Sequence, residues 1–245
     1  MMVGLAAAAA VAAVLPAATA STLPAATFPP HLVGSTDAAA ALLERVLPGS
    51  SAQFELAIEP VCPGIPEGKA CFTLADGAGG KTKITGTSAS EITAGIGVYL
   101  REHCNMTIGW PRGGGSRIFT PTPSWPRVGV SRQQSRNARW SYFMNVCTHS
   151  YSLVWYSWSD WEALIDWMAL SGINNVLAMT GQEEIAYKVF RKFGLSDLQI
   201  RSWFNGPALL TWSRGQNEYG SGVAGPLPRS WMKEQWGLQR QILAR

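Results

Sequence analysis

Short β-prone segments and capped helices alternate through the second half of the chain, and this order limits the fold more than any other feature. The segment 139–147 is β-prone and leads through a polar aromatic loop into a predicted helix over 161–172. The segment 173–179 is predicted to be a short buried strand, with helices over 182–193 and 197–204 after it. Such an order favours βαβ units on a parallel sheet and is typical of the opening of a (β/α)8 barrel.

Polar residues at the predicted helix starts and a glycine at one helix end support this interpretation. Ser159 with Glu162, and Ser196 with Gln199, have the spacing of a capping box. In that motif the serine hydroxyl and the side chain three residues later each bond a free backbone N–H. Gly172 is predicted to end the first helix, because glycine readily adopts the left-handed conformation that follows many helices.

The first half of the chain predicts a small α+β domain over 36–127, preceded by a Pro-, Ala-, Ser- and Thr-rich linker over 21–35. A helix capped by Thr36 or Asp37 is expected to begin this domain. Strands at 53–59, 71–75 and 81–86, a helix at 89–104 with Ser88 and Glu91 as its capping box, and a short strand near 106–110 are predicted to follow. The start of the barrel is then assigned to 128–245.

The two ends of the chain carry their own signals. Residues 2–18 form an apolar, alanine-rich run followed by small residues, which predicts a signal peptide over 1–20. The run has no Lys or Arg before it, so an alanine-rich tail is the alternative. No other stretch is apolar for long enough to span a bilayer. The last residues are expected to form an amphipathic helix without a stop signal, so we expect a truncated chain.

Cysteine usage fits a secretory route but does not decide the pairing. Cys62 and Cys71 flank a turn-rich loop and could form a disulfide in an oxidising compartment. The chain has 4 cysteines, which allow three pairings. Asn105 opens an N-glycosylation sequon, which fits the same route. His103 and Cys104 are adjacent on a predicted helix and point in different directions, so no metal site is predicted there.

The net charge of +4 is small for 245 residues, and most basic residues are scattered. Binding of nucleic acid normally takes a clustered basic face, so no such partner is predicted. Arginines do gather around the Gly-rich connector 111–116, and we interpret them as solvated charge, with an anionic-ligand patch as the alternative. They are Arg112, Arg117, Arg127, Arg132, Arg136 and Arg139. The connector lacks the Lys and Ser/Thr of a phosphate-binding loop, and no cofactor is predicted.

Polar and aromatic side chains are predicted to gather where the barrel strands end, which is where ligands bind in such a fold. The residues expected there are Asn145, Cys147, His149, Tyr151, Gln182, Glu183, Glu184, Trp212, Arg214 and Asn217. Amide, phenol, indole and carboxylate groups suit a sugar, whose hydroxyls need hydrogen bonds and whose apolar face stacks on aromatic rings. Core packing is the alternative for several of the 11 tryptophans, namely Trp155, Trp158, Trp161 and Trp167.

No catalytic set can be assembled from these residues. Glycoside hydrolysis takes two facing carboxylates. Glu183 and Glu184 are adjacent on a predicted helix, where their side chains diverge by about 100°. His149 has no acid partner that the sequence locates, and a thiol nucleophile formed by Cys147 with His149 is only an alternative. We therefore predict no catalytic residue and no metal ligand in this chain.

Four segments have sequences that match a known enzyme family. They are NVCTHSYSLVW from Asn145, WEALIDWMALSGINNVLAMTGQEE from Trp161, FNGPALLTWSR from Phe204 and GPLPRSW from Gly225. Within a match from about Phe54 onward, they resemble the α-N-acetylglucosaminidases of glycoside hydrolase family 89. The resemblance implies an N-terminal α/β domain, a (β/α)8 catalytic barrel and a helical C-terminal domain. It also implies removal of terminal α-linked N-acetylglucosamine with retention, by two glutamates, and in animals a lysosomal enzyme that acts on heparan sulfate.

By this resemblance the sugar-binding residues of the chain are Asn145, Cys147, Tyr151 and Trp212. Gly215 stands where the animal enzyme has a bulkier apolar residue, so the contacts on that side differ. The two catalytic glutamates belong to later barrel strands and have no counterpart here. The segment 128–245 is less than half of the roughly 250 residues of a complete barrel, enough for two or three βα units.

We therefore expect the N-terminal part of an exo-acting retaining glycosidase, which by itself lacks turnover. Its expected partner is a glycan with a terminal N-acetylglucosamine, and the full-length form could be a homo-oligomer. The expected location is the secretory pathway, ending in a lysosome or vacuole or outside the cell. Two alternatives stay open: a non-catalytic secreted carbohydrate-binding short form, and an unrelated Trp-rich structural protein.

Overall fold

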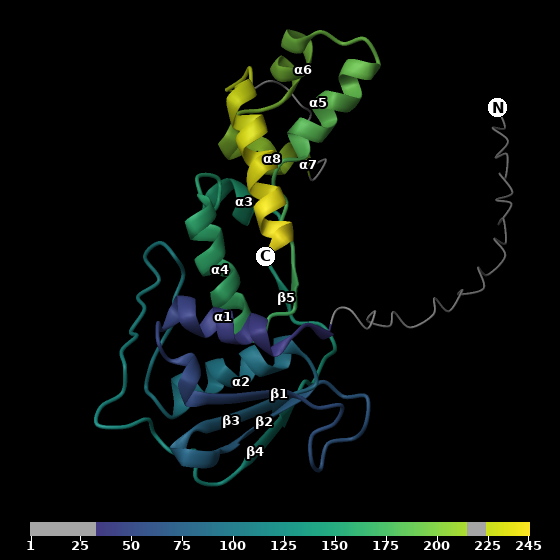
Figure 1. Cartoon of the computed structure of the whole chain (residues 1–245). Helices are drawn as coiled ribbons and strands as arrows, with labels where there is room; N and C mark the ends of the chain where they lie inside the picture. Colours follow the sequence, from purple (N-terminus) through teal and green to yellow (C-terminus); the bar gives the residue numbers. More distant parts are fainter. Residues whose placement is uncertain (1–32, 215–223) are drawn as a thin grey trace, which may run out of the picture.

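The computed structural model describes residues 33–214 and 224–245. The predictions for the signal peptide over 1–20, for nearly all of the linker over 21–35, and for Gly215 and Asn217 lie outside the described residues. The chain forms two regions in sequence order: a sheet covered by two helices, and a largely helical segment that stands on those helices (Figure 1).

A four-stranded mixed sheet forms the base of the first region. Its strands are β1 (Phe54–Ile58), β2 (Cys71–Asp76), β3 (Thr82–Gly86) and β4 (Arg132–Ser135), in the order β1-β3-β2-β4. β1 runs parallel to β3, whereas β2 runs antiparallel to both of its neighbours. The first three strands confirm the predicted ones. In β3, Thr82 and Ile84 are buried while Lys83 is exposed, as alternation along a strand predicts.

The fourth strand is not the one predicted near 106–110, because Thr107 forms only an isolated bridge there. The edge of the sheet is taken by β4, which comes later in the chain. At the end of β2, the Asp76 carboxylate accepts hydrogen bonds from the backbone N–H groups of Val128 (2.8 Å) and Gly129 (3.2 Å). These bonds bring the chain back beside β2, so residues beyond 127 complete the first sheet.

Helices α1 (Thr36–Val46) and α2 (Ala89–Glu102) cover one face of this sheet (Figure 1). The N-cap of α1 is Ser35, and not Thr36 or Asp37 as predicted. Ser88 caps α2 as predicted, but the Glu91 carboxylate binds Arg136 and does not close the box. An apolar core fills the space between helices and sheet. Its fully buried members include Leu43, Leu74, Ile84, Ile92, Ile96 and Tyr99.

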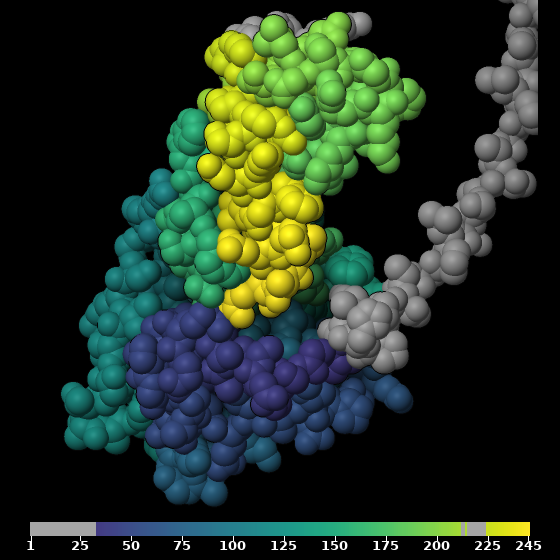
Figure 2. Space-filling view, turned by 45° about the horizontal axis from the view of Figure 1, so that its top comes forward, coloured from purple at the N-terminus to yellow at the C-terminus, as the bar shows by residue number. Residues whose placement is uncertain are grey.

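The second region contains one pair of short parallel strands and most of the helices. β5 (Tyr142–Phe143) pairs with β6 (Asn175–Val176), and α4 (Trp158–Leu170) lies between them in the chain. This is the predicted βαβ unit, and no closed barrel forms within the described residues. The other helices are α3 (Thr148–Tyr151), α5 (Gln182–Lys192), α6 (Asp197–Trp203), α7 (Leu210–Arg214) and α8 (Arg229–Ala244). In Figure 2, α8 appears in yellow beside α4 and the green segment that contains α5, and it packs against both helices.

The predicted buried strand over 173–179 is wrong in both length and burial. Only Asn175 and Val176 pair with β5, and Val176 is 37% exposed. A strand becomes buried on both faces only when layers cover both. The described residues supply a layer on one side only, where Phe143, Ile173 and Ala178 pack against the core of α4.

The start of α4 also differs from the prediction. Its capping box is formed by Ser157 and Asp160, and not by Ser159 and Glu162. Arg112 donates two hydrogen bonds to the Asp160 carboxylate, at 3.0 and 2.6 Å, and these bonds lower the pKa of Asp160 to about 2. Arg112 is therefore not simply solvated. The predicted box of Ser196 and Gln199 at α6 is confirmed.

Arginines of the first region fix α4 onto α2. Gly97 on α2 allows the approach, because a Cβ there would lie 1.8 Å from the Leu170 carbonyl oxygen at the end of α4. Arg101 donates to that oxygen at 3.0 Å, and Arg136 donates to the Gly172 oxygen at 2.5 Å. These carbonyls are the negative end of the helix dipole, which favours cations. The side chain of Arg136 is only 12% exposed, so its predicted solvation is wrong.

Cys62 and Cys71 form a disulfide, which decides among the pairings that the sequence left open. Cys104 is buried and Cys147 half-buried, and both are free thiols. Over the described ranges, no group of three His, Cys, Asp or Glu side chains could hold a metal ion. Among the helices that the structure describes, none is both long enough and apolar enough to cross a membrane.

Candidate functional site

The residues predicted to line a sugar site follow the two parallel strands at the same end. α3 comes shortly after β5, and the segment 177–181 comes directly after β6. Because parallel strands end at the same edge, the fold brings these two segments together. α7 lies against α3, since the backbone N–H of Thr211 donates to the Ser150 hydroxyl at 3.0 Å. We call the surface formed by α3, segment 177–181 and α7 the rim.

Asn145 shapes the first part of the rim. Its side-chain oxygen accepts from the backbone N–H groups of Cys147 at 2.8 Å and Thr148 at 3.3 Å, which turns the chain into α3. An Asn side chain that bonds the backbone two residues later is a common turn former. Cys147 is half-buried and Tyr151 is 65% exposed, so both reach the surface near this turn.

Trp212 lies on α7, between two residues that are anchored to other segments. The structure does not describe the side chain of Trp212, so the role of Trp212 in the rim stays a prediction. The structure places the backbone of Trp212 beside α3, where Tyr151 lies, through the bond between Thr211 and Ser150. The roles of Asn145, Cys147 and Tyr151 as sugar ligands stay predictions as well.

His149 has a partner that sequence reasoning could not locate, because that partner is backbone. Its Nε2 lies 2.8 Å from the Leu177 carbonyl oxygen and 3.4 Å from the Met179 nitrogen. The ring stacks on Trp161, with centroids 6.0 Å apart. Burial lowers the pKa of His149, the bond to Leu177 opposes this, and the charge of Arg214 lowers it further. His149 thus links α3 to the segment after β6.

Glu183 and Glu184 are both buried, and each binds a different arginine. Arg214 donates to the two oxygens of Glu183 at 2.6 and 2.7 Å. Arg229, at the start of α8, donates to both oxygens of Glu184. The side chains therefore diverge as predicted, and neither carboxylate faces the other across a site. The sequence shows two adjacent acids at a helix start, but nothing in it indicates that each would bind a separate arginine.

The tryptophans divide between core and surface. Trp161 is fully buried, and Trp158 and Trp167 pack against the same core around α4, so the core interpretation is right for these three. It is wrong for Trp155, which is 61% exposed. Exposed aromatic rings beside hydrogen-bonding side chains are compatible with a surface that binds sugars.

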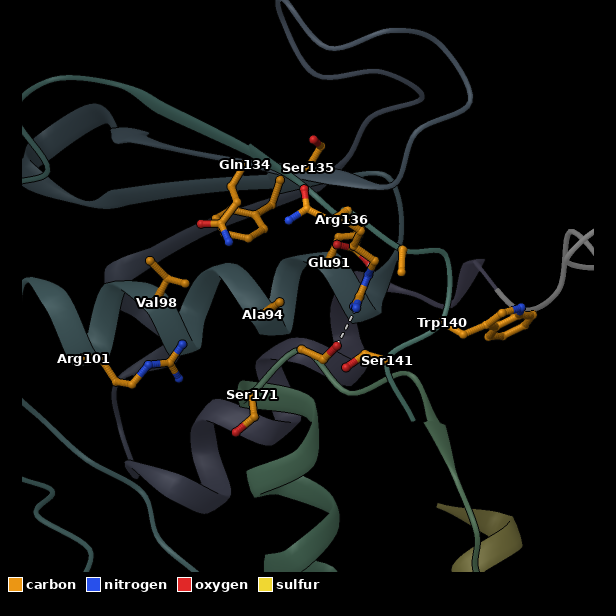
Figure 3. A pocket seen from close by; sticks show the side chains of 14 residues that line it. Glu91, Ala94, Val98, Arg101, Gln134, Ser135, Arg136, Trp140, Ser141 and Ser171 are labelled. Atoms are coloured by element: carbon orange, nitrogen blue, oxygen red, sulfur yellow. Dashed lines mark hydrogen bonds and ion pairs between the residues drawn. The ribbon is translucent and has the colours of Figure 1, made fainter. Parts of the chain in front are cut away.

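Two hollows lie away from the rim, beside the start of α2 and the segment 134–141. One has a volume of about 330 Å³ and is shown in Figure 3, between α2, β4 and the turn after α4. Arg136 crosses it, bonded to Glu91 and to the Gly172 carbonyl. A neighbouring hollow of about 840 Å³ shares Arg136 and Trp140 in its lining. Since Arg136 holds two elements together, we interpret its role there as structural.

Two family models match the chain, one for each region. Residues 37–127 match the N-terminal domain of alpha-N-acetylglucosaminidase (NAGLU), and residues 141–245 match the tim-barrel domain of the same enzyme. The chain is also similar to human alpha-N-acetylglucosaminidase, with 38% identity over 204 residues. That match covers 83% of this chain and 26% of the human protein.

Solved structures of a family 89 glycoside hydrolase from Clostridium perfringens have the same fold. One, in complex with PUGNAc, is 28% identical with a TM-score of 0.73. Another carries two glutamate-to-glutamine substitutions and holds its substrate GlcNAc-alpha-1,4-galactose, at 29% identity and a TM-score of 0.75. Each match covers 84% of this chain and 22% of the solved chain. The chain thus spans about a quarter of the length of the relatives it matches.

Proposed function

Because this chain belongs to the α-N-acetylglucosaminidase family, glycoside hydrolase family 89, we propose that it contributes the substrate-binding rim of an exo-acting retaining glycosidase. The enzyme releases terminal α-linked N-acetylglucosamine from a glycan. This chain supplies the N-terminal domain and the first part of the catalytic barrel. The observation that carries the proposal is the convergence of α3, the segment after β6, and α7 at the carboxyl ends of β5 and β6.

The chemistry of the rim suits recognition of a sugar. Tyr151 offers a hydroxyl and an exposed ring, Asn145 an amide, and Cys147 a half-buried thiol. Sugar hydroxyls need both donors and acceptors, and rings stack on their apolar faces. With Trp212 on α7, these residues would surround one terminal sugar residue.

The same residues do not supply bond cleavage, and we propose that this chain alone does not turn over substrate. Retaining hydrolysis needs two carboxyl groups about 5–5.5 Å apart, one as nucleophile and one as acid. Near the rim, Glu183 and Glu184 are each bound by an arginine. Because the two carboxylates bind different arginines and point apart, they do not form the facing pair that retaining hydrolysis needs. In the related bacterial enzyme, a form with two glutamates replaced by glutamine is found in complex with its substrate, which supports catalysis by two glutamates in that enzyme.

Calorimetry and a turnover assay test the proposal together. We expect the purified chain to bind GlcNAc-alpha-1,4-galactose, and Tyr151→Ala and Trp212→Ala to remove that binding. An aryl α-N-acetylglucosaminide should release no phenol above a tag-only control. Absence of any sugar binding would contradict the proposed rim, and clear turnover would contradict the claim that the catalytic pair is missing.

A binding-only role is the second candidate, and the occupied carboxylates favour it. A chain with a sugar rim and no available acid pair would act as a secreted carbohydrate-binding short form. It would be soluble and monomeric by light scattering, and it would bind N-acetylglucosamine. The first candidate instead requires activity from the same rim in a chain with the length of the human relative.

We propose the secretory pathway as the location, with a lysosome, vacuole or the cell exterior as the final compartment. The disulfide between Cys62 and Cys71 supports this, because such bonds persist in oxidising compartments. The proposed partner is a glycan with a terminal N-acetylglucosamine, of the heparan-sulfate type in animals. We further propose that the full-length form is a homo-oligomer, which sedimentation of that form would test.

A further inference from the structure

We propose that Glu183 and Arg214 are positioning residues whose buried ion pair fixes α7, so that the rim has its shape before a sugar binds. The inference rests on the proposed function, because it concerns the same rim. Neither residue is proposed to contact the sugar or the bond that is broken.

The pair has the geometry of a rigid joint. Arg214 donates from Nε and Nη2 to the two oxygens of Glu183, and from Nη1 to the Met179 carbonyl oxygen at 2.8 Å. The planar guanidinium therefore has three partners in fixed directions, which a lysine could not reproduce. The two side chains are 9% and 2% exposed, so water screens the interaction little.

The pair holds one end of α7, and a second bond holds the other. Arg214 is the last residue of α7 and binds the segment after β6. Thr211, near the start of α7, donates its backbone N–H to Ser150 of α3. Trp212 lies between these two anchors, so its backbone position follows from them. His149, bonded to Leu177, links the same two supporting segments directly to each other.

The neighbouring pair offers a matched control within the chain. Glu184 is buried like Glu183 and accepts two hydrogen bonds from Arg229. That pair ties α5 to the start of α8, and the ion-pair partners of Glu184 among the described residues, Arg229 and Lys188, lie outside the rim. A general loss of stability should follow from breaking either pair, whereas loosening of α7 should follow only from breaking the Glu183–Arg214 pair.

Amide hydrogen exchange of the whole chain tests the proposal. We compare Glu183→Gln and Arg214→Lys with Glu184→Gln and Arg229→Lys, and measure exchange over 210–214 together with the midpoint of thermal unfolding. Exchange over 210–214 should accelerate at least about tenfold in the first two variants and stay unchanged in the control pair. Affinity for 2-acetamido-1,2-dideoxynojirimycin, a compound that a related family 89 structure from Clostridium perfringens holds, should fall about tenfold in the first two variants only.

Ser150→Ala provides a milder variant in case breaking the buried pair unfolds the chain. It removes the acceptor of the Thr211 N–H, and exchange should then accelerate at Thr211 without loss of the fold. Equal acceleration over 210–214 in both pairs of variants, or none in either, would overturn the proposal. If the unaltered chain binds no sugar analogue, the proposed function fails, while exchange over 210–214 still decides whether the ion pair positions α7.

Discussion

The two regions of the molecule contain the same kinds of element but differ in how completely these are covered. In the first region, the sheet and α2 place Leu74, Ile84 and Ile92 at full burial. In the second, β5 and β6 pair over two residues each, and Val176 is partly exposed. The comparison teaches that a correct helix or strand does not by itself make a core, because burial needs a second layer within reach.

Helix α5 shows the difference most plainly. Its two acidic residues, Glu183 and Glu184, point inward to arginines. On another side, Ile185, Val189 and the C-cap residue Phe193 follow each other at four-residue spacing and are 56%, 42% and 76% exposed. A surface helix usually turns such an apolar stripe toward a neighbour. No described residue covers this one.

The largest expected effect comes from the joint between the two regions. Gly97→Ala should place a Cβ against the Leu170 carbonyl oxygen and force α2 and α4 apart. We expect a loss of about 3 kcal/mol or more in the free energy of unfolding, measured with denaturant. The matched control is Gly237→Ala in α8, where a Cβ meets nothing within 4 Å. There we expect a gain of about 0.5–1 kcal/mol, and a loss of similar size at both glycines would contradict this account.

The disulfide should matter next, and only for the first region. Cys62→Ser with Cys71→Ser frees a loop with a sequence separation of 9 residues. We expect a loss of about 2–3 kcal/mol from the greater freedom of the unfolded chain. Adding a reductant should lower the free energy of unfolding of the unaltered chain by the same amount, as measured with denaturant. Cys147 is a free thiol, so Cys147→Ser is the control and should change the free energy of unfolding little. A larger loss in Cys147→Ser than in the double variant would contradict the stabilising role of the disulfide.

A pH dependence should arise at Asp166 on α4, whose carboxylate accepts hydrogen bonds from Arg45 of α1 and from Arg245 after α8. Burial raises the pKa of Asp166 to about 6, although Arg45 opposes this by donating at 2.9 and 2.8 Å. A carboxyl whose folded pKa lies above its unfolded pKa stabilises the fold fully below the unfolded value. That contribution is lost as the pH rises from about 4 to about 6 and should amount to about 1–3 kcal/mol. In Asp166→Asn this pH dependence of the free energy of unfolding should vanish. The same dependence in the variant would show that Asp166 is not its source.

The smallest effect on stability is expected at the exposed stripe of α5. Phe193→Glu removes an apolar ring that is 76% exposed, so the free energy of unfolding should change by no more than about 0.5 kcal/mol. Self-association measured by light scattering should decrease, because the apolar surface shrinks. Ile200→Glu on α6, at 1% exposure, is the buried control and should unfold the local helices. A large loss of stability at Phe193 would show that the stripe is covered after all.

Local patterns predicted the elements well and their partners less well. The helix over 182–193 and the box of Ser196 with Gln199 are confirmed because turn chemistry and helical periodicity act within a few residues. The fourth strand of the first sheet was missed, since β4 is placed by a bond between Asp76 and residues more than fifty positions later. No pattern within the segment 132–135 predicts that it pairs with β2.

The candidate site shows the same division. The sequence predicted Asn145, Cys147 and Tyr151 after a strand and Trp212 in a loop after a helix, and resemblance to a family implied that all four bind the sugar. It could not give the partners of His149 or Arg214, because backbone carbonyls such as those of Leu177 and Met179 carry no residue identity.

By itself, the sequence determined most of the longer helices, three strands of the first sheet, the parallel βαβ start of a barrel and the residue types of its rim, because these depend on periodicity and on side-chain chemistry. Only the tertiary structure decided that Glu183 and Glu184 bind separate arginines, that Arg136 lies inside a joint, and that α7 is held at both ends. The physical reason is that buried charge must find a partner in space. That partner is set by how the elements pack, and it lies 31 to 45 positions away in the chain.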